Sequence, residues 1–180
     1  MASWNKIARR IRVPLGFLFA AVYLWLAHPS VRSIIIGVCI ATLGLLVRAL
    51  ASGHVQKNEQ LAMSGPYAYT RNPLYLGSLI IACGFAVASR SWFVAGIAAV
   101  MLFAIYIPVI RSEEDFLRTR FAEFDDYCRN VPRLFPKLKA NQGSAGSFSA
   151  HLYCKHREYN AALGAVLMTV ALIVKILWPR

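Results

Sequence analysis

Length and composition exclude most classes of soluble protein. The chain has 180 residues, of which 58% are apolar and only 16% are charged, whereas soluble domains carry about 45–50% apolar and about 25% charged residues. The net charge of +12 would suit a nucleic-acid-binding protein, but the charges lie between long apolar runs. Composition therefore favours an all-α, polytopic membrane protein with membrane lipids, and no nucleic acid, as partners.

Five apolar runs approach the length of a membrane-spanning helix, which is about 20 residues with a range of about 17–25. In chain order they cover residues 13–27, 31–51, 74–88, 92–110 and 161–178. The first run is short, but snorkelling of Arg12 can extend it, and no Ala-x-Ala cleavage site follows it. Pro29 and Ser30 are expected to turn the chain into the second run. The runs contain glycines that allow close helix packing: Gly37, Gly44, Gly77, Gly84 and Gly96.

The distribution of basic residues predicts the orientation of these spans. With a cytoplasmic N-terminus, all of the 20 Lys and Arg residues except Arg32, Arg90, Lys175 and Arg180 fall on the cytoplasmic side. An excess of cations marks cytoplasmic loops. We therefore expect a multi-pass protein of a bacterial inner membrane or an endoplasmic-reticulum-type membrane, with its active site facing the cytoplasm.

The cysteines show no metal or disulfide pattern. Cys39, Cys83, Cys128 and Cys154 include no Cys-x-x-Cys pair, and the first two fall inside apolar runs. Cysteine-based zinc sites usually contain closely spaced thiols. We therefore expect buried, unreactive thiols and no metal site.

Two of the expected cytoplasmic segments, 52–73 and 111–136, remain to carry a function. The segment after them contains the flexible sequence NQGSAGS. We expect a four-helix core over residues 1–136, a linker and interfacial segment over 137–160, and a C-terminal transmembrane helix over 161–180.

The first of these segments leads into the sequence 65-GPYAYTRNPLYLG-77. Ser64, Gly65 and Pro66 predict a turn, and Pro73 suits the first turn of the next helix. Asn72 is expected to cap that helix with its side chain. On composition alone, a capped loop with interfacial tyrosines explains this sequence as well as a functional site does.

The second segment begins as a helix that continues from the fourth span. Its apolar residues recur at helical spacing and predict one apolar face: Phe116, Leu117, Phe121 and Phe124. Glu113 and Glu114 lie in its first cytoplasmic turn, where acidic side chains are costly unless they have partners. The acidic pair is therefore a candidate functional site.

At these positions the sequence resembles the isoprenylcysteine carboxyl methyltransferase and phospholipid methyltransferase group of integral-membrane enzymes. Their pattern is Gly-x-Tyr, Arg-His/Asn-Pro-x-Tyr-x-Gly, a helical pair, and then Glu-Glu, Tyr and Val-Pro. The matching positions here are Gly65, Tyr67, Arg71, Asn72, Pro73, Tyr75, Gly77, Glu113, Glu114, Tyr127, Val131, Pro132 and Pro136. Residues 54–59 also resemble the His…Gln-Asn-Glu sequence of the carboxyl methyltransferases. The likeness covers about residues 31–136 and indicates the family rather than one substrate.

The resemblance implies S-adenosylmethionine as the methyl donor, held between the cytoplasmic ends of the helices. It implies that the cofactor is bound by Gln56, Glu59, Leu61, Tyr67, Asn72, Pro73, Leu74, Tyr75 and Glu113. It implies catalytic roles for Arg111 and Glu114, although the register of Arg111 against the family arginine is open. The carboxyl methyltransferases carry histidine in place of Asn72. Asparagine cannot titrate, so the resemblance implies a positioning role there.

We therefore expect methyl transfer to a lipophilic acceptor, an isoprenoid or a lipid with a carboxyl or amine group. Such an in-line displacement depends chiefly on aligning the acceptor atom with the methyl group. Two alternatives stay open: a membrane reductase of the sterol type, which has a similar Arg-His-Pro-x-Tyr-x-Gly turn, and a non-enzymatic membrane protein that binds lipid or a partner. The sequence indicates neither the acceptor nor the oligomeric state.

Overall fold

The computed structural model describes residues 18–55, 60–140 and 146–178, and within them every regular element is helical. A helix over residues 18–26 comes first. It is followed by α2 (Val31–Ser52), η1 (Gly65–Ala68), α3 (Pro73–Ser89), α4 (Trp92–Met101), η2 (Leu102–Tyr106), α5 (Ile107–Arg120), α6 (Phe124–Asn130), α7 (Ala150–Lys155) and α8 (Tyr159–Leu177). η1 is a 3₁₀ turn and η2 is a π-helical turn. The expected all-α class is confirmed.

Three helices are long and apolar enough to cross a membrane: Val31–Ser52, Trp92–Arg120 and Tyr159–Leu177. The second of these joins α4, η2 and α5 in one continuous helix. The expected third span is the shorter apolar helix Pro73–Ser89. The expected first span lies partly outside the described residues. The structure therefore supports a membrane protein, while the number of five spans stays a prediction.

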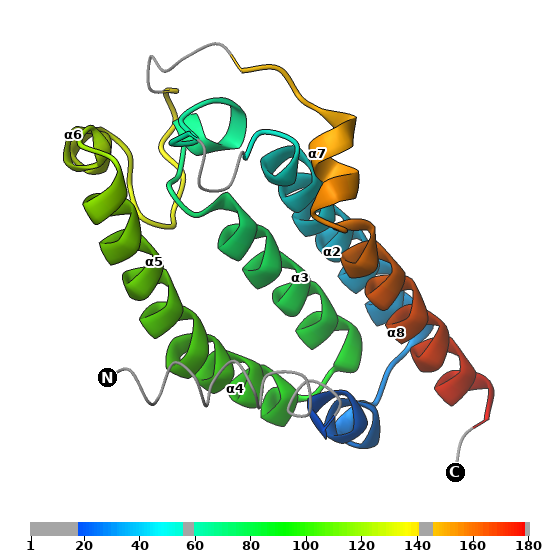
Figure 1. The fold of residues 1–180 in the computed structure, drawn as a ribbon. Coiled ribbons are helices and arrows are strands. Elements are labelled where there is room, and N and C mark those ends of the chain that lie inside the picture. Colours follow the sequence, from blue (N-terminus) through cyan, green and yellow to red (C-terminus); the bar gives the residue numbers. More distant parts are fainter. Residues whose placement is uncertain (1–17, 56–59, 141–145, 179–180) are drawn as a thin grey trace.

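The axes of the long helices are roughly aligned, with α2 and α3 antiparallel, and the short elements lie at the ends of these helices (Figure 1). In Figure 1, α6, η1 and α7 lie at one end of the long helices. The turn from α3 to α4 and the start of α2 lie at the other end. At that second end the Ser33 hydroxyl donates to the carbonyl oxygen of Ala88 over 3.0 Å. Ser30 and Ser33 also cap α2 reciprocally, so the expected turn at Ser30 is confirmed.

The most extensive helix contact of the described chain joins α2 and α3 along their glycines. A Cβ atom at Gly44 would lie 2.6 Å from the carbonyl oxygen of Gly77, and one at Gly84 would lie 2.5 Å from that of Gly37. Larger side chains would force the two backbones apart. The predicted close approach is confirmed for this pair. It is wrong for Gly96, where an added Cβ would meet no atom of the described residues within 4 Å.

The C-terminal helix α8 packs against α2. Leu172 is fully buried in an apolar cluster that includes Tyr23, and the Lys175 ammonium donates to the carbonyl oxygen of Leu24. Just before α8, Glu158 forms a bidentate ion pair with Arg48 of α2, with a closest N–O distance of 2.7 Å. These contacts connect α8 to the remaining helices, and the division into a core and an appended helix stays a prediction.

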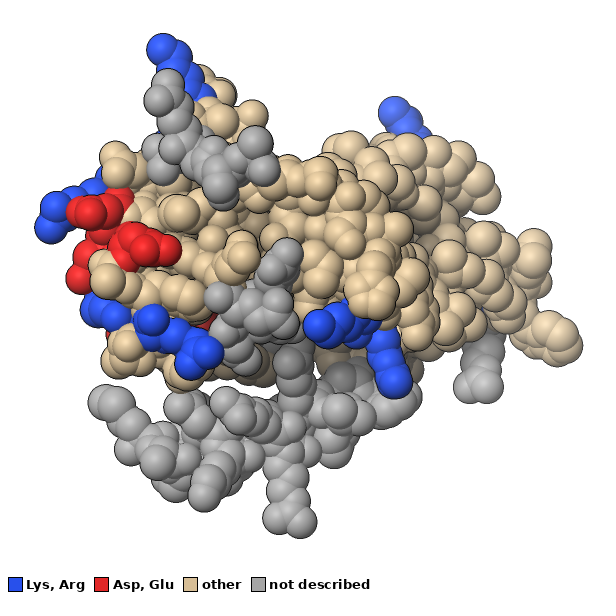
Figure 2. All heavy atoms as spheres, turned by 45° about the horizontal axis from the view of Figure 1, so that its top comes forward, with Lys and Arg blue, Asp and Glu red and all other residues tan. Residues whose placement is uncertain are grey.

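The outer surface of the long helices is apolar. Figure 2 shows the acidic side chains gathered at one edge of the face in view, with most of the rest uncharged. Large apolar side chains are exposed along α2, α4 and α8, including Ile35, Leu43, Phe93, Val100, Val166, Leu167 and Val170. Water-soluble monomers rarely expose such extensive apolar surface, so these faces suit membrane lipid.

Cys39 and Cys83 lie on this exposed surface, as Cys154 of α7 also does, and no disulfide joins the four cysteines. The expectation of buried thiols is therefore wrong for these three residues. An apolar run in a spanning helix can face lipid as well as protein, so hydropathy alone does not distinguish the two environments.

Candidate active site

A polar cavity of about 450 Å³ lies where the chain between α2 and α3 meets α5 and α6. Its walls come from Val55, from residues 60–78 and from residues 106–127, together with Arg48 and Glu158. This is the end of the molecule that carries η1, α6 and α7 (Figure 1). We call it the polar cavity.

The structure brings most of the predicted site residues together around the polar cavity. Those that line it are Leu61, Tyr67, Asn72, Pro73, Leu74, Tyr75, Glu113 and Glu114. Gln56 and Glu59 lie outside the described residues. Arg111 is exposed on α5 and is not among the lining residues. The two predicted segments therefore meet, while the role of each residue stays a prediction, and that of Arg111 has no support from the cavity.

The turn before α3 is built around a glycine with a left-handed backbone. Gly65 has a φ of +57°, and an added Cβ there would also lie 2.7 Å from the ring of His54. The following turn buries Tyr67, whose carbonyl oxygen accepts a hydrogen bond of 2.7 Å from the Tyr127 hydroxyl. Burial raises the pKa of both tyrosines well above the ordinary value. Their hydroxyls therefore stay protonated and can donate.

Asn72 stands at the N-cap of α3, but its side chain makes no capping hydrogen bond. Its Nδ2 donates to the carbonyl oxygen of Arg133 over 2.9 Å and to Oε1 of Glu114 over 3.4 Å. The side-chain amide of Asn72 thus binds the buried carboxylate of Glu114 and a backbone carbonyl instead of the end of α3. The expected capping role is therefore wrong. Pro73 does occupy the first turn of α3, as predicted.

Glu114 is the buried acid of the site, with an exposed fraction of 4%. Its Oε2 accepts from Nε and NH2 of Arg133 at 2.9 and 2.8 Å, and its Oε1 lies 3.5 Å from NH2 of Arg71. A buried carboxylate is tolerated only with such partners. Glu114 therefore ties α5 to the turn before α3 and to the chain after α6. Its predicted catalytic role stays a prediction.

Glu113 differs from Glu114 because it is exposed and shares its carboxylate with a tyrosine. The Tyr75 hydroxyl donates to Oε1 of Glu113 over 2.8 Å. The ring of Tyr75 meets the ring of Tyr106 edge-on, with centroids 5.3 Å apart. Tyr106 ends the π-helical turn η2, and such turns recur at functional sites. Glu113 therefore lies at the wall of the polar cavity beside Tyr75, whose ring also packs on Tyr106.

Arg71 supplies a cation to the same wall, with only 11% of its side chain exposed. Its NH1 donates to Sγ of Cys128 and its NH2 faces Glu114. Its Nε is buried without a hydrogen-bond partner in the described part of the chain. Unsatisfied buried donors are rare in native proteins. This N–H is therefore a candidate contact for an acceptor group of a ligand.

Several lining residues had no predicted role in the site: Arg48, Arg71, Ser78, Tyr106, Tyr127 and Glu158. Two of them, Arg71 and Tyr127, do belong to the family pattern. Besides Arg71 and Tyr127, Arg48 carries a signal that could have identified it. Arg48 interrupts an apolar run, and an ionisable residue within a span is a functional candidate by default. Tyr106 has no such signal, because its position depends on the π-helical turn.

These features together define a helical membrane protein with a polar cavity at one end of its long helices. The sequence model of the phospholipid methyltransferase family matches residues 12–123, and the chain belongs to this family. The predicted family membership is thereby confirmed.

Two curated relatives carry names that refer to metal resistance. The chain is 39% identical to the cobalt-zinc-cadmium resistance protein CzcN of Cupriavidus metallidurans over 111 residues, which is 61% of this chain and 50% of that protein. It is 35% identical to the nickel-cobalt-cadmium resistance protein NccN of Alcaligenes xylosoxydans xylosoxydans over 135 residues, 71% of this chain and 62% of that protein. The match thus spans less than two thirds of each relative. No solved structure matches the chain.

Proposed function

We propose that this chain is an S-adenosylmethionine-dependent methyltransferase that acts on a lipophilic acceptor at a membrane surface. The main observation in favour is the polar cavity, which the two distant segments predicted from the family pattern build jointly. Membership of the phospholipid methyltransferase family supports a membrane methyltransferase. The particular donor and acceptor belong to the proposal.

The residues around the polar cavity fit the chemistry of this donor. Its volume of about 450 Å³ lies within the range of about 300–1,000 Å³ of small-molecule sites. Glu113 can accept from an ammonium or a ribose diol, and the buried Nε of Arg71 can donate to a carboxylate. The rings of Tyr75 and Tyr106 offer faces that attract a cation. When bound, the donor supplies a methyl group on a sulfonium, whose sulfur keeps the bonding electrons as the methyl passes to the acceptor.

The contribution of the chain itself is binding and orientation. The network of Glu114, Asn72 and Arg133 fixes the start of α3 relative to α5, which holds Tyr75 beside Glu113. Asn72 cannot remove a proton, so an ammonium acceptor would have to lose its proton to another group. A carboxylate acceptor needs no base, and alignment is then the main requirement.

The sidedness of the site belongs to the same proposal. The polar cavity lies among the segments that the charge distribution assigns to the cytoplasm, including residues 111–136. A cytoplasmic opening would give a water-soluble donor direct access to the cavity.

The names of the two relatives refer to metal resistance, a function that this proposal does not include. Within the described residues, the structure contains no group of three or more His, Cys, Asp or Glu side chains placed to hold a metal ion. The proposal of a methyltransferase rests on the family and on the polar cavity.

The test of this proposal is a calorimetric titration of the detergent-purified protein with S-adenosylhomocysteine. We expect saturable binding, and we expect labelled methyl groups to pass from S-adenosylmethionine to a lipid extract. A flat titration with folded protein would contradict the proposal and favour a non-enzymatic lipid-binding protein. Binding of a nicotinamide cofactor instead would favour the reductase alternative.

Replacing Glu113 with alanine is expected to weaken S-adenosylhomocysteine binding about 10- to 150-fold, because a hydrogen bond to a charged group contributes about 1.5–3 kcal/mol. Calorimetry on the two proteins measures the change. Asp126→Ala is a matched control, since Asp126 is an exposed acid on α6 that pairs with Arg129 and does not line the polar cavity. Equal affinity of Glu113→Ala and wild type would show that Glu113 does not contact the donor.

A further inference from the structure

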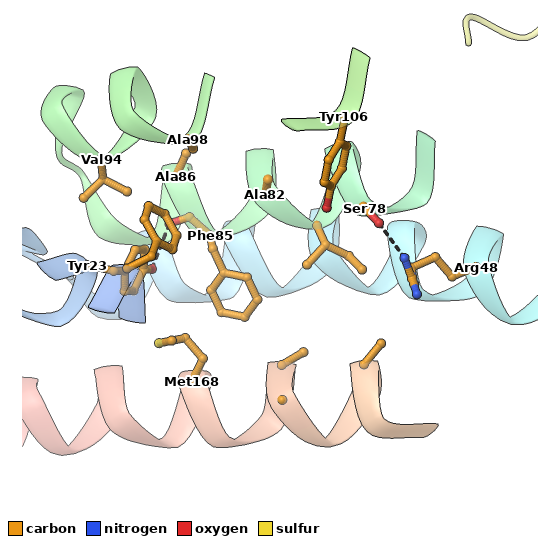
Figure 3. Close-up of a pocket in the computed structure, with 15 residues that line it drawn as sticks. Tyr23, Arg48, Ser78, Ala82, Phe85, Ala86, Val94, Ala98, Tyr106 and Met168 are labelled. Atoms are coloured by element: carbon orange, nitrogen blue, oxygen red, sulfur yellow. Dashed lines mark hydrogen bonds between the residues drawn. The ribbon is translucent and has the colours of Figure 1, made fainter. Parts of the chain in front are cut away.

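A second cavity of about 420 Å³ lies between α3, α4 and α8, and its lining is largely apolar. Figure 3 shows Phe85, Val94 and Met168 toward one end of it, and Tyr106, Ser78 and Arg48 toward the other. We call it the apolar cavity. Its walls come from the helices that the apolar surface assigns to the membrane.

The apolar cavity adjoins the polar cavity at one end. Arg48, Ser78 and Tyr106 line both cavities. At this junction Arg48 donates to Ser78 and to the carbonyl oxygen of Leu74, and it holds the carboxylate of Glu158. Polar groups are thus concentrated where the two cavities meet, and they give way to apolar groups toward Phe85.

α8 forms one wall of the apolar cavity with small side chains. Ala161, Gly164 and Ala165 line it, with Met168 deeper along the same helix. A Cβ added at Gly164 would meet no atom within 4 Å in the part of the chain that the structure describes, so this position faces open space. α8 also lies beyond residue 123, where the match to the family model ends. The match to the family model therefore does not cover this wall.

We propose that the apolar cavity holds the hydrocarbon chain of the acceptor lipid, and that the small residues of α8 determine which chains are admitted. This inference rests on the proposed methyltransferase function. The polar end of the acceptor lies at the junction of Arg48, Ser78 and Tyr106, next to the polar cavity, and its chain extends toward Phe85 and Met168. The arrangement fits a lipid because its polar group can contact the residues at the junction while its hydrocarbon chain contacts the apolar lining.

Gly164→Leu tests this inference, because a leucine there fills the cavity without displacing backbone. The probe is palmitic acid with a photoactivatable diazirine on its chain, cross-linked to the full-length protein in detergent and mapped by mass spectrometry. In the wild type we expect adducts on Phe85 and on the α8 residues that line the apolar cavity, which are Ala161, Gly164, Ala165 and Met168. We expect Gly164→Leu to reduce them at least tenfold and Gly164→Ala to reduce them less.

Gly96→Leu is the matched control. Gly96 is also an exposed glycine on an apolar helix with no atom within 4 Å of an added Cβ, but it does not line the apolar cavity. We expect its cross-linking pattern and lipid methylation to equal those of the wild type. We expect Gly164→Leu to lower methyl transfer to a lipid extract at least tenfold, while S-adenosylhomocysteine affinity stays unchanged.

The outcomes separate this inference from the proposed function. If S-adenosylhomocysteine binds but the adducts do not depend on Gly164, or if they map only to outward residues such as Leu163 and Leu167, the cavity does not hold the chain and the inference is overturned. If the adducts depend on Gly164 but no S-adenosylhomocysteine binds, the chain site is supported while the methyltransferase proposal fails.

Discussion

Replacing Glu114 with alanine is expected to lower the free energy of unfolding by about 3–5 kcal/mol, the usual cost of removing one partner from a buried charge network. Glu114 is 4% exposed and holds Arg71, Arg133 and Asn72. Without its carboxylate, the largely buried guanidinium of Arg71 loses its acidic partner. Thermal unfolding in detergent, followed by circular dichroism, measures the change.

Two comparisons make this result specific. Asp115→Ala removes the neighbouring acid, which is exposed and pairs only at the surface with Arg118, so we expect little change. Glu114→Gln keeps the size of the side chain and one acceptor oxygen, so we expect an intermediate loss. If Glu114→Ala unfolds like Asp115→Ala, the network does not hold α5 to the start of α3.

Replacing Gly77 with leucine is expected to have the second large effect. A Cβ at Gly77 would lie 2.7 Å from the carbonyl oxygen of Gly44, and overpacking of this kind costs about 1–3 kcal/mol or more. Because α3 also carries Leu74 and Tyr75, a shift of α3 away from α2 would displace part of the polar cavity. We therefore expect both a lower unfolding temperature and weaker S-adenosylhomocysteine binding, measured on the same preparation.

Gly96→Leu again provides the control, because it adds the same side chain to an apolar helix at a position with open space. It is expected to leave both quantities near the wild-type values. If Gly77→Leu retains wild-type stability and affinity, the close approach of α2 and α3 is not required for the site.

Sequence reasoning succeeded where the signal was local or periodic. Long apolar runs predicted α2 and α8 with boundaries within a few residues, and they predicted the start of the helix at Trp92, which continues beyond the apolar run to Arg120. The glycines of α2 and α3 predicted a close helix contact, because only backbone-sized residues allow it. The meeting of the Tyr75 and Glu113 segments came from the family pattern and was not derivable from hydropathy.

The remaining features depend on tertiary contacts that no local signal contains. Asn72 fits the helix-capping pattern, yet its amide is taken by Arg133 and Glu114, which lie far along the chain. Arg48 and Glu158 are 110 positions apart, so their pairing depends on where α8 packs. The exposure of Cys39 shows the same limit, since an apolar run does not reveal which of its faces meets lipid.

The continuous helix Trp92–Arg120 has a consequence for the depth of the site. Its 29 residues correspond to about 43 Å at a rise of about 1.5 Å per residue, which exceeds the roughly 30 Å thickness of the hydrocarbon layer. Trp92 to Glu113 spans about 31 Å on the same scale. This helix, which includes the π-helical turn η2, is therefore long enough to place Glu113 at the level of the lipid headgroups on one side of a membrane when Trp92 lies at the other side. At that level a dissolved molecule and a lipid can approach the same carboxylate from opposite directions.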